Sequence, residues 1–366
     1  MNIKIIYDKL RLVKKVVGSV VMKIIKFIGK LLSFVGVFVV FLVINLYLMC
    51  LIFCYGPSKN ARDIFVTTML ETGQMKFVVG LVMTDEMVQK IVNSNSLTAM
   101  EEEVDSDLIK VESDTSQPDI ELKEVSGNTF FGKILIIKDP AKVKLATIYD
   151  GSWKEYGITL DKLVTDNNAI AGVNGGLYFS DSNKGGRPLG VVVRDNKIEY
   201  NNTSGLAGLY MIGFDQDNLL QIIDIAGKNK TEVENIVKEN KIRDAVAFQE
   251  ESSDANNHFV KLIINGEKRD VKGSGSGANP RTAIGQRKDG TVLLLVTDGR
   301  GANGHLGATA SDLIEVMEEF GAVNAANLDG GSSSSMYYNG KYEMTSVTLY
   351  YSNSSWRLPT GFVVSK

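Results

Sequence analysis

The chain has 366 residues, of which 44% are hydrophobic, 23% charged and 8% aromatic, and its formal net charge is −3. This ordinary globular composition excludes collagen-like, coiled-coil and fully disordered chains. The small net charge excludes a global positive field, so no nucleic-acid partner is expected. Both cysteines, Cys50 and Cys54, lie in one apolar run. The rest of the chain therefore has neither a disulfide framework nor a cysteine zinc site.

Residues 31–55 form 25 consecutive positions without a formal charge. At about 1.5 Å per residue they span roughly 37 Å, more than the ~30 Å hydrocarbon core of a bilayer. Eight basic residues and one acid occupy residues 1–30. The positive-inside rule then predicts a cytoplasmic segment over 1–30, a transmembrane signal anchor over 31–55, and the remainder outside. A cleaved signal peptide or a buried core helix is the alternative, but no small-residue cleavage site follows the run.

Two connecting segments are expected before the main domain. Residues 56–100 read as a membrane-proximal helical stalk, in which Thr84 is a candidate N-cap. Residues 101–126 read as a solvated acidic linker, because positions 101–124 carry ten acids and only two lysines.

From residue 127 to 366, short β-rich runs recur, with hairpin signals at Asn265-Gly266 and Asp289-Gly290. Two helices are predicted from capping boxes, one begun by Thr231 and one by Thr309. The predicted fold class is α+β: a strand-rich single catalytic domain with a few helices, preceded by one transmembrane helix and a stalk.

Three segments depart from core patterning. One β-rich run ends in Asn174-Gly175-Gly176, which fits either a turn that needs positive φ or a strand end that a ligand can approach. The Gly-Ser repeat at 273–277 fits no dinucleotide or P-loop pattern, so a mobile loop is the better reading. Arg281 follows this repeat at the start of a strand, where its planar fork suits a phosphate or a carboxylate.

The third segment contains two apolar runs that each end in Asp-Gly, at Asp298 and at Asp329. A helical pattern lies between them, and strand–helix–strand units are usually parallel. Both carboxylates should then lie at one sheet edge, where open α/β sheets place ligands. Two carboxylates with Arg300 beside them suit cleavage at an anomeric carbon with a phosphate leaving group. His305 follows the Asp298 loop and is a further candidate, while Ser332–Ser335 lacks the pattern of a nucleophile elbow.

At these residues the sequence resembles the phosphodiester glycosidase family. The motifs are Asn174-Gly175-Gly176 with Tyr178-Phe179, Asn279-Pro280-Arg281-Thr282, Val296-Thr297-Asp298-Gly299-Arg300 and Asn327-Leu328-Asp329-Gly330-Gly331-Ser332-Ser333. The resemblance covers about residues 127–365. It implies Asp298 and Asp329 as catalytic residues and a substrate-binding set, namely Asn174, Gly175, Arg281, Thr282, Arg300, Gly330, Gly331 and Ser332.

The resemblance also implies an activity and a setting. The expected function is hydrolysis of the glycosidic bond of a sugar-1-phosphate diester in envelope or exopolysaccharide metabolism, with a phosphate-linked carbohydrate as substrate. The alternative is a non-catalytic polysaccharide-binding or assembly module. The anchor and stalk resemble those of Gram-positive members, so the catalytic domain is expected outside the cell. The resemblance implies no definite cofactor, and a divalent cation such as calcium, its ligands and the oligomeric state stay open.

Overall fold

The computed structural model describes residues 3–72, 75–111, 119–253, 256–345 and 353–366. Two compact units divide the chain, Met1–Arg62 and Asp63–Lys366. Helix α1 (Ile3–Tyr55) makes up most of the first unit. Its stretch Arg11–Tyr55 is long and apolar enough to cross a membrane, by length and composition. The apolar run at 31–55 is therefore helical, and the helix continues through the basic segment before it.

The second unit begins with helices and continues as a strand-rich domain. Its helices are α2 (Lys59–Glu71, from Asp63 on), α3 (Phe77–Gly80), α4 (Asp85–Ser94), α5 (Leu160–Asp166), α6 (Lys230–Glu239) and α7 (Ala310–Glu319). Thr84 caps α4 by accepting a hydrogen bond from the Met87 amide at 3.4 Å, as its position before the acidic first turn predicts. The segment expected as a stalk, 56–100, is helical over much of its length, and its residues from Asp63 onward belong to the same compact unit as the strands.

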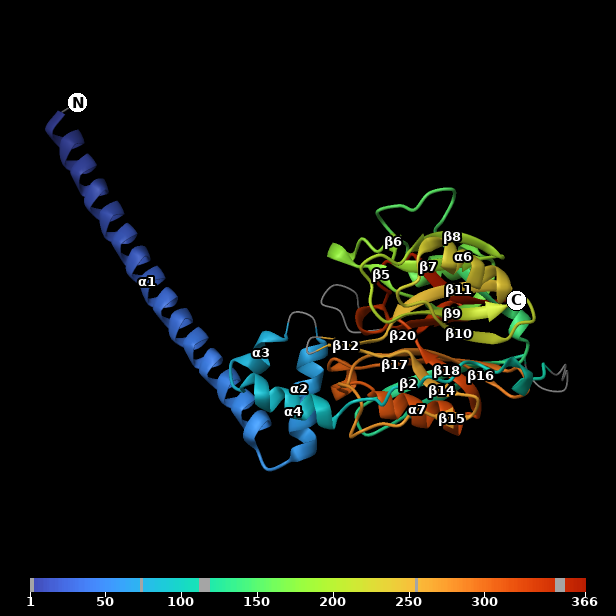
Figure 1. The fold of residues 1–366 in the computed structure, drawn as a ribbon. Coiled ribbons are helices and arrows are strands. Elements are labelled where there is room, and N and C mark those ends of the chain that lie inside the picture. The colour runs from blue at the N-terminus through green and yellow to red at the C-terminus, as the bar shows by residue number, and fades with distance from the viewer. Residues whose placement is uncertain (1–2, 73–74, 112–118, 254–255, 346–352) are drawn as a thin grey trace. The chain divides into compact units, whose positions relative to one another are not determined.

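Three larger sheets form the body of the domain (Figure 1). The seven-stranded sheet runs β1 (Ile120–Ser126), β2 (Phe131–Ile137), β17 (Val292–Thr297), β16 (Thr282–Arg287), β18 (Ala322–Asn327), β14 (Lys261–Ile264), β15 (Glu267–Lys268). One five-stranded sheet runs β10 (Leu220–Asp224), β9 (Leu209–Asp215), β11 (Ile242–Gln249), β7 (Gly190–Arg194), β8 (Lys197–Asn202). The other runs β20 (Lys341–Thr345), β19 (Ser335–Tyr338), β4 (Ala169–Asn174), β21 (Thr360–Ser365), β3 (Val143–Thr147). Two short pairs complete the strands: β5 (Tyr178–Phe179) with β6 (Arg187–Pro188), and β12 (Glu251–Ser253) with β13 (Asn256–His258).

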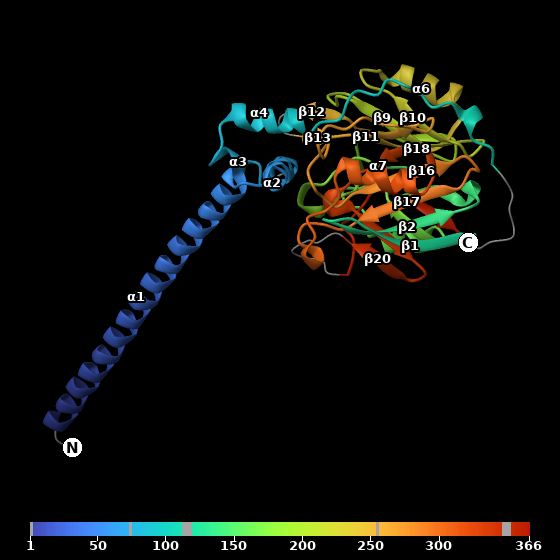
Figure 2. The same cartoon turned by 90° about the horizontal axis from the view of Figure 1, so that it is seen from below.

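One apolar core lies between the three sheets, and a helix backs each sheet on its other face. In β17, Val292, Leu294 and Val296 belong to the shared core, while Leu293 and Leu295 pack with α7. This follows from the two-residue period of a strand, which sends successive side chains to opposite faces. Figure 2 shows α7 across the seven-stranded sheet. Helix α6 packs in the same way with the sheet of β9 and β11, and α5 with that of β4.

The structure corrects two expectations about where secondary structure begins. Part of the segment predicted as an acidic linker, 101–126, is strand β1, which pairs antiparallel with β2. Its residues Ile120 and Leu122 alternate with the charged residues Glu121 and Lys123 and pack against the shared core, so the acid count concealed a strand period. Helix α6 begins two residues earlier than expected, because Asn229 and not Thr231 is its N-cap. One of the β-rich runs expected between residues 127 and 366, at 347–351, lies outside the described residues.

The unit β17–α7–β18 determines where the candidate site residues lie. Both β17 and β18 pair antiparallel with β16, which lies between them, so the two are parallel to each other. Thr309 caps α7 with the predicted capping box, and Gly321 with φ +77° follows the last turn. The expected parallel strand–helix–strand arrangement is therefore confirmed.

Candidate active site

The ends of β17 and β18 and the start of β16 meet at one edge of the seven-stranded sheet. Thr282 faces Val296, and Ala283 faces Asn327, in the two strand pairings. Asp298 directly follows β17, and Asp329 follows β18 by two residues. Because neighbouring strands lie about 4.8 Å apart, the two strand ends are about 10 Å apart at the backbone. The two aspartates therefore share an edge, as their positions in the sequence predict.

Asp298 is a buried carboxylate with two fixed partners. It is 4% exposed, and its Oδ1 accepts a hydrogen bond from the Phe131 backbone amide at 2.8 Å. Its Oδ2 lies 2.7 Å from Nδ1 of His305, whose side chain is 31% exposed. A carboxylate bonded to one imidazole nitrogen orients the ring and leaves the other nitrogen to exchange a proton.

A closed turn holds His305 in this place. Within it, the Arg300 amide donates to Leu306 O at 3.0 Å, and the Gly301 amide donates to His305 O at 2.8 Å. Gly307 closes the turn with φ +127°, and a Cβ there would lie 2.4 Å from the Asn279 backbone. Only glycine permits this close approach, so the turn is anchored against the segment before β16.

Asp329 lies in a different environment. Burial raises the pKa of its carboxyl to about 7, and hydrogen bonds from Ser333 and the Gly330 backbone and the charge of Arg300 offset only part of that rise. Ser333 also lies 2.9 Å from the hydroxyl of Tyr178, and burial together with the Asp329 charge raises the pKa of Tyr178. Asp329 can therefore carry a proton near neutral pH.

Arg300 is the exposed cation of this edge. Its backbone adopts φ +55°, and its Nη1 donates to the Ser332 hydroxyl at 2.8 Å. A Cβ added to Gly331 would lie 2.7 Å from Nη2 of Arg300, so the guanidinium lies directly against the loop that follows Asp329. A planar, permanently charged group in this place suits a phosphate.

Asn174 is a buried residue that hydrogen-bonds to several chain segments of the site. It is 1% exposed, and its Nδ2 donates to the backbone oxygen of Asp329 at 2.6 Å. Its Oδ1 accepts from the Thr282 hydroxyl at 2.7 Å and from the Ser335 amide at 3.1 Å. The side chains of Asn174 and Thr282 are therefore engaged with each other and with the chain. Gly175 also packs tightly, since a Cβ there would lie 2.4 Å from the Thr360 hydroxyl.

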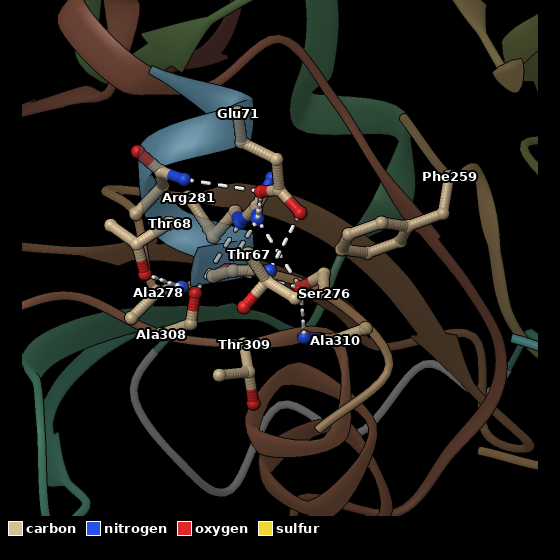
Figure 3. A network of polar contacts seen from close by, with 12 residues as sticks. Thr67, Thr68, Glu71, Phe259, Ser276, Ala278, Arg281, Ala308, Thr309 and Ala310 are labelled. Atoms are coloured by element: carbon tan, nitrogen blue, oxygen red, sulfur yellow. Dashed lines mark hydrogen bonds and ion pairs between the residues drawn. The ribbon is translucent and has the colours of Figure 1, made fainter. Parts of the chain in front are cut away.

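Arg281 is buried and paired with a residue from far earlier in the chain. It is 7% exposed, and its Nη2 donates to Oε2 of Glu71, at the end of α2, at 2.6 Å (Figure 3). The glycine-rich segment expected as a mobile loop instead lies against this helix, since a Cβ at Gly277 would lie 2.7 Å from the backbone of Thr67. These glycines allow the loop to receive a helix.

Glu71, Tyr178 and Ser333 are neighbours of this edge that the sequence did not predict, although Tyr178 and Ser333 lie within the family motifs. No local pattern marks Glu71. Among the described residues, no group of three or more His, Cys, Asp or Glu is placed to hold a metal ion. A divalent cation therefore stays a prediction, which chelation during an activity assay can test.

Comparison with known proteins covers the same motifs. A family model for phosphodiester glycosidase matches residues 167–365. The catalytic domain of zebrafish N-acetylglucosamine-1-phosphodiester alpha-N-acetylglucosaminidase, described as auto-inhibited by pro-peptide, is similar with a TM-score of 0.50 and 19% identity, over 70% of this chain and 86% of that one. A hypothetical protein from Synechocystis has a TM-score of 0.42 and 15% identity, over 67% of this chain and 61% of that one.

One relative matches this chain in sequence over a shorter stretch. The SPbeta prophage-derived protein YomE of Bacillus subtilis (strain 168) is 45% identical over 64 residues, which are 18% of this chain and 10% of that protein. The alignment thus spans only a tenth of that relative's length. The four motifs named in the sequence analysis all lie within the range matched by the family model, whereas α2 and Glu71 lie before it.

Proposed function

This chain belongs to the phosphodiester glycosidase family, and from that premise we propose that it hydrolyses the glycosidic bond of a sugar-1-phosphate diester at the edge that carries Asp298 and Asp329. One observation carries the proposal: two different proton-exchanging groups lie at the same edge of the sheet. One is the Asp298–His305 pair, with 2.7 Å between the carboxylate and the imidazole. The other is Asp329, with a pKa raised to about 7.

The two groups suit the two halves of a hydrolysis. His305, oriented by Asp298, accepts a proton from the water that attacks the anomeric carbon. The bond between that carbon and the phosphate oxygen breaks, and its electron pair leaves with the phosphate monoester. Protonated Asp329 donates a proton to the departing phosphate, and Arg300 neutralises its charge. The products are a free sugar and a phosphate monoester.

The substrate and the setting are proposals of the same kind. The activity named for the zebrafish relative makes an N-acetylglucosamine-1-phosphodiester the first compound to test. Helix α1 supports a single-pass anchor in the cell membrane with a cytoplasmic N-terminus. The domain would then act outside the cell of a Gram-positive bacterium, on phosphate-linked glycans of the envelope or an exopolysaccharide.

The experiment is a product assay with the full chain in detergent. Synthetic N-acetylglucosamine-1-phosphodiesters should yield free sugar and phosphate monoester in equal amounts. Asp298→Asn and Asp329→Asn are nearly isosteric controls and should abolish both products together. Binding of a phosphate-linked polysaccharide without release of either product would contradict the proposal and favour a non-catalytic binding module.

A further inference from the structure

Glu71 ends helix α2, and three donors surround its carboxylate. The Gly277 amide donates to Oε1 at 2.6 Å, while Arg281 Nη2 at 2.6 Å and Asn279 Nδ2 at 3.1 Å donate to Oε2 (Figure 3). The side chains of Glu71 and Arg281 are 6% and 8% exposed. This is a buried ion pair between a helix near the start of the domain and the segment that leads into β16.

Other contacts already hold the Arg281 guanidinium in place. Its Nε donates to Ala308 O at 3.3 Å, its Nη2 donates to Gly277 O at 2.8 Å, and its Cζ lies 5.0 Å from the centre of the Phe259 ring. These partners are neutral, and a buried guanidinium without a carboxylate is strongly destabilised. Glu71 supplies the charge that allows Arg281 to stay in this position.

The segment that carries Arg281 contacts both strand ends of the candidate site. The Thr297 amide, one residue before Asp298, donates to Arg281 O at 2.9 Å, and the Arg281 amide donates to the Thr297 hydroxyl at 3.0 Å. The Gly331 amide, two residues after Asp329, donates to Pro280 O at 2.8 Å. A shift of this short segment would therefore move the backbone beside both aspartates.

We propose that Glu71 is a positioning residue for the reaction proposed above. Through its ion pair with Arg281 it fixes the Pro280–Arg281 backbone, and thereby the relative placement of Asp298 and Asp329. The inference rests on the proposed function. It gives a helix outside the range matched by the family model a role in the site. It also means that Arg281 positions the site from behind, while Arg300 faces the substrate.

The test compares Glu71→Gln with a control from the same helix, in the full chain in detergent. Asp63 is 2% exposed, and its Oδ2 accepts a hydrogen bond from Asn95 Nδ2 at 3.1 Å. Asp63→Asn therefore weakens the seating of α2 without removing the partner of Arg281. Both variants should lower the melting temperature. Only Glu71→Gln should lower kcat, by roughly 10- to 100-fold, because small misplacements of catalytic groups are costly. KM should change less than about threefold, because no substrate contact is lost.

A second readout does not depend on activity. Hydrogen exchange at the Gly331 and Thr297 amides reports their bonds to Pro280 O and Arg281 O. It should be faster in Glu71→Gln than in Asp63→Asn. This comparison tests the positioning role even if the wild-type chain does not hydrolyse the diester, so failure of the two proposals can be told apart. Should Glu71→Gln not fold, Glu71→Asp keeps the charge on a shorter side chain and should show the same changes in smaller size.

Three results would overturn the inference. One is unchanged kcat and unchanged exchange in Glu71→Gln. Another is an equal loss of kcat in Asp63→Asn at an equal loss of melting temperature, since this would reduce Glu71 to a general structural role. The third is a gain in activity in Glu71→Gln, which would mean that Glu71 competes with the substrate phosphate for Arg281.

Discussion

Replacing Asp329 by Asn should make the domain more stable at alkaline pH while abolishing its activity. Burial raises the pKa of Asp329 to about 7 in the folded protein, against about 3.9 for an unperturbed aspartate. Between these two values the folded state holds a proton that the unfolded state has lost. Stability therefore falls as the pH rises from about 4 to about 7, and the group contributes no further change outside that window.

The size of the effect follows from the same two values. Between pH 5 and pH 8 the wild-type domain should lose roughly 2.5 kcal/mol of unfolding free energy through this one group. Asp329→Asn removes that dependence, because an amide does not titrate. The neutral side chain keeps an oxygen that can accept from Ser333 or Gly330. The variant should thus be more stable than wild type by roughly 4 kcal/mol at pH 8 and by about 1.5 kcal/mol at pH 5.

Urea unfolding at both pH values measures this. The two tryptophans of the chain, Trp153 and Trp356, both lie in the strand-rich unit, so their fluorescence reports that unit and not α1. Turnover should fall about 10²-fold or more in the same variant, because a proton donor is lost. A wild-type stability that is flat or rises between pH 5 and pH 8 would refute the reasoning, as would an Asn variant less stable than wild type at pH 8.

The other predictions concern the neighbouring groups. Asp298→Asn removes the partner that orients His305 and should lower kcat by about 10²-fold or more, measured by phosphate monoester release. His305→Gln should cause a similar loss in the same assay, because the group that accepts the proton of the attacking water is removed. Arg300→Lys keeps the charge but loses the planar fork, so KM should rise several-fold with a smaller change in kcat. Arg281→Lys should lower the melting temperature and leave KM nearly unchanged, because this arginine is buried against Glu71. Protease added to wall-stripped cells should remove the strand-rich domain and leave an N-terminal stub, whereas complete protection of the domain would contradict the external orientation.

The sequence was most informative where local patterns and topology rules act together. The apolar runs before Asp298 and Asp329, with a capped helix between them, were sufficient to predict a parallel pair of strands that end at one edge. The glycine turns at 265–266 and 289–290 were equally informative, since Gly266 and Gly290 both adopt positive φ in hairpins. These features depend on the conformation of a few neighbouring residues, which can be inferred from the types of those residues.

Long-range partnerships were not predictable in this way. Glu71 and Arg281 are 210 positions apart, and nothing in their local sequences links them. The burial that raises the pKa of Asp329 is likewise a property of packing and not of the motif. Strand β1 was missed for a different reason. Its acids are the exposed half of a strand whose other half, Ile120 and Leu122, packs inward.

The proposed reaction breaks the bond between the anomeric carbon and the phosphate oxygen. Hydrolysis of an N-acetylglucosamine-1-phosphodiester by the full chain in water enriched in ¹⁸O tests it directly, with mass analysis of the phosphate monoester. Attack at carbon predicts a phosphate monoester that contains no ¹⁸O, with all the incorporated label in the sugar. Label in the phosphate monoester would show attack at phosphorus and would contradict the account.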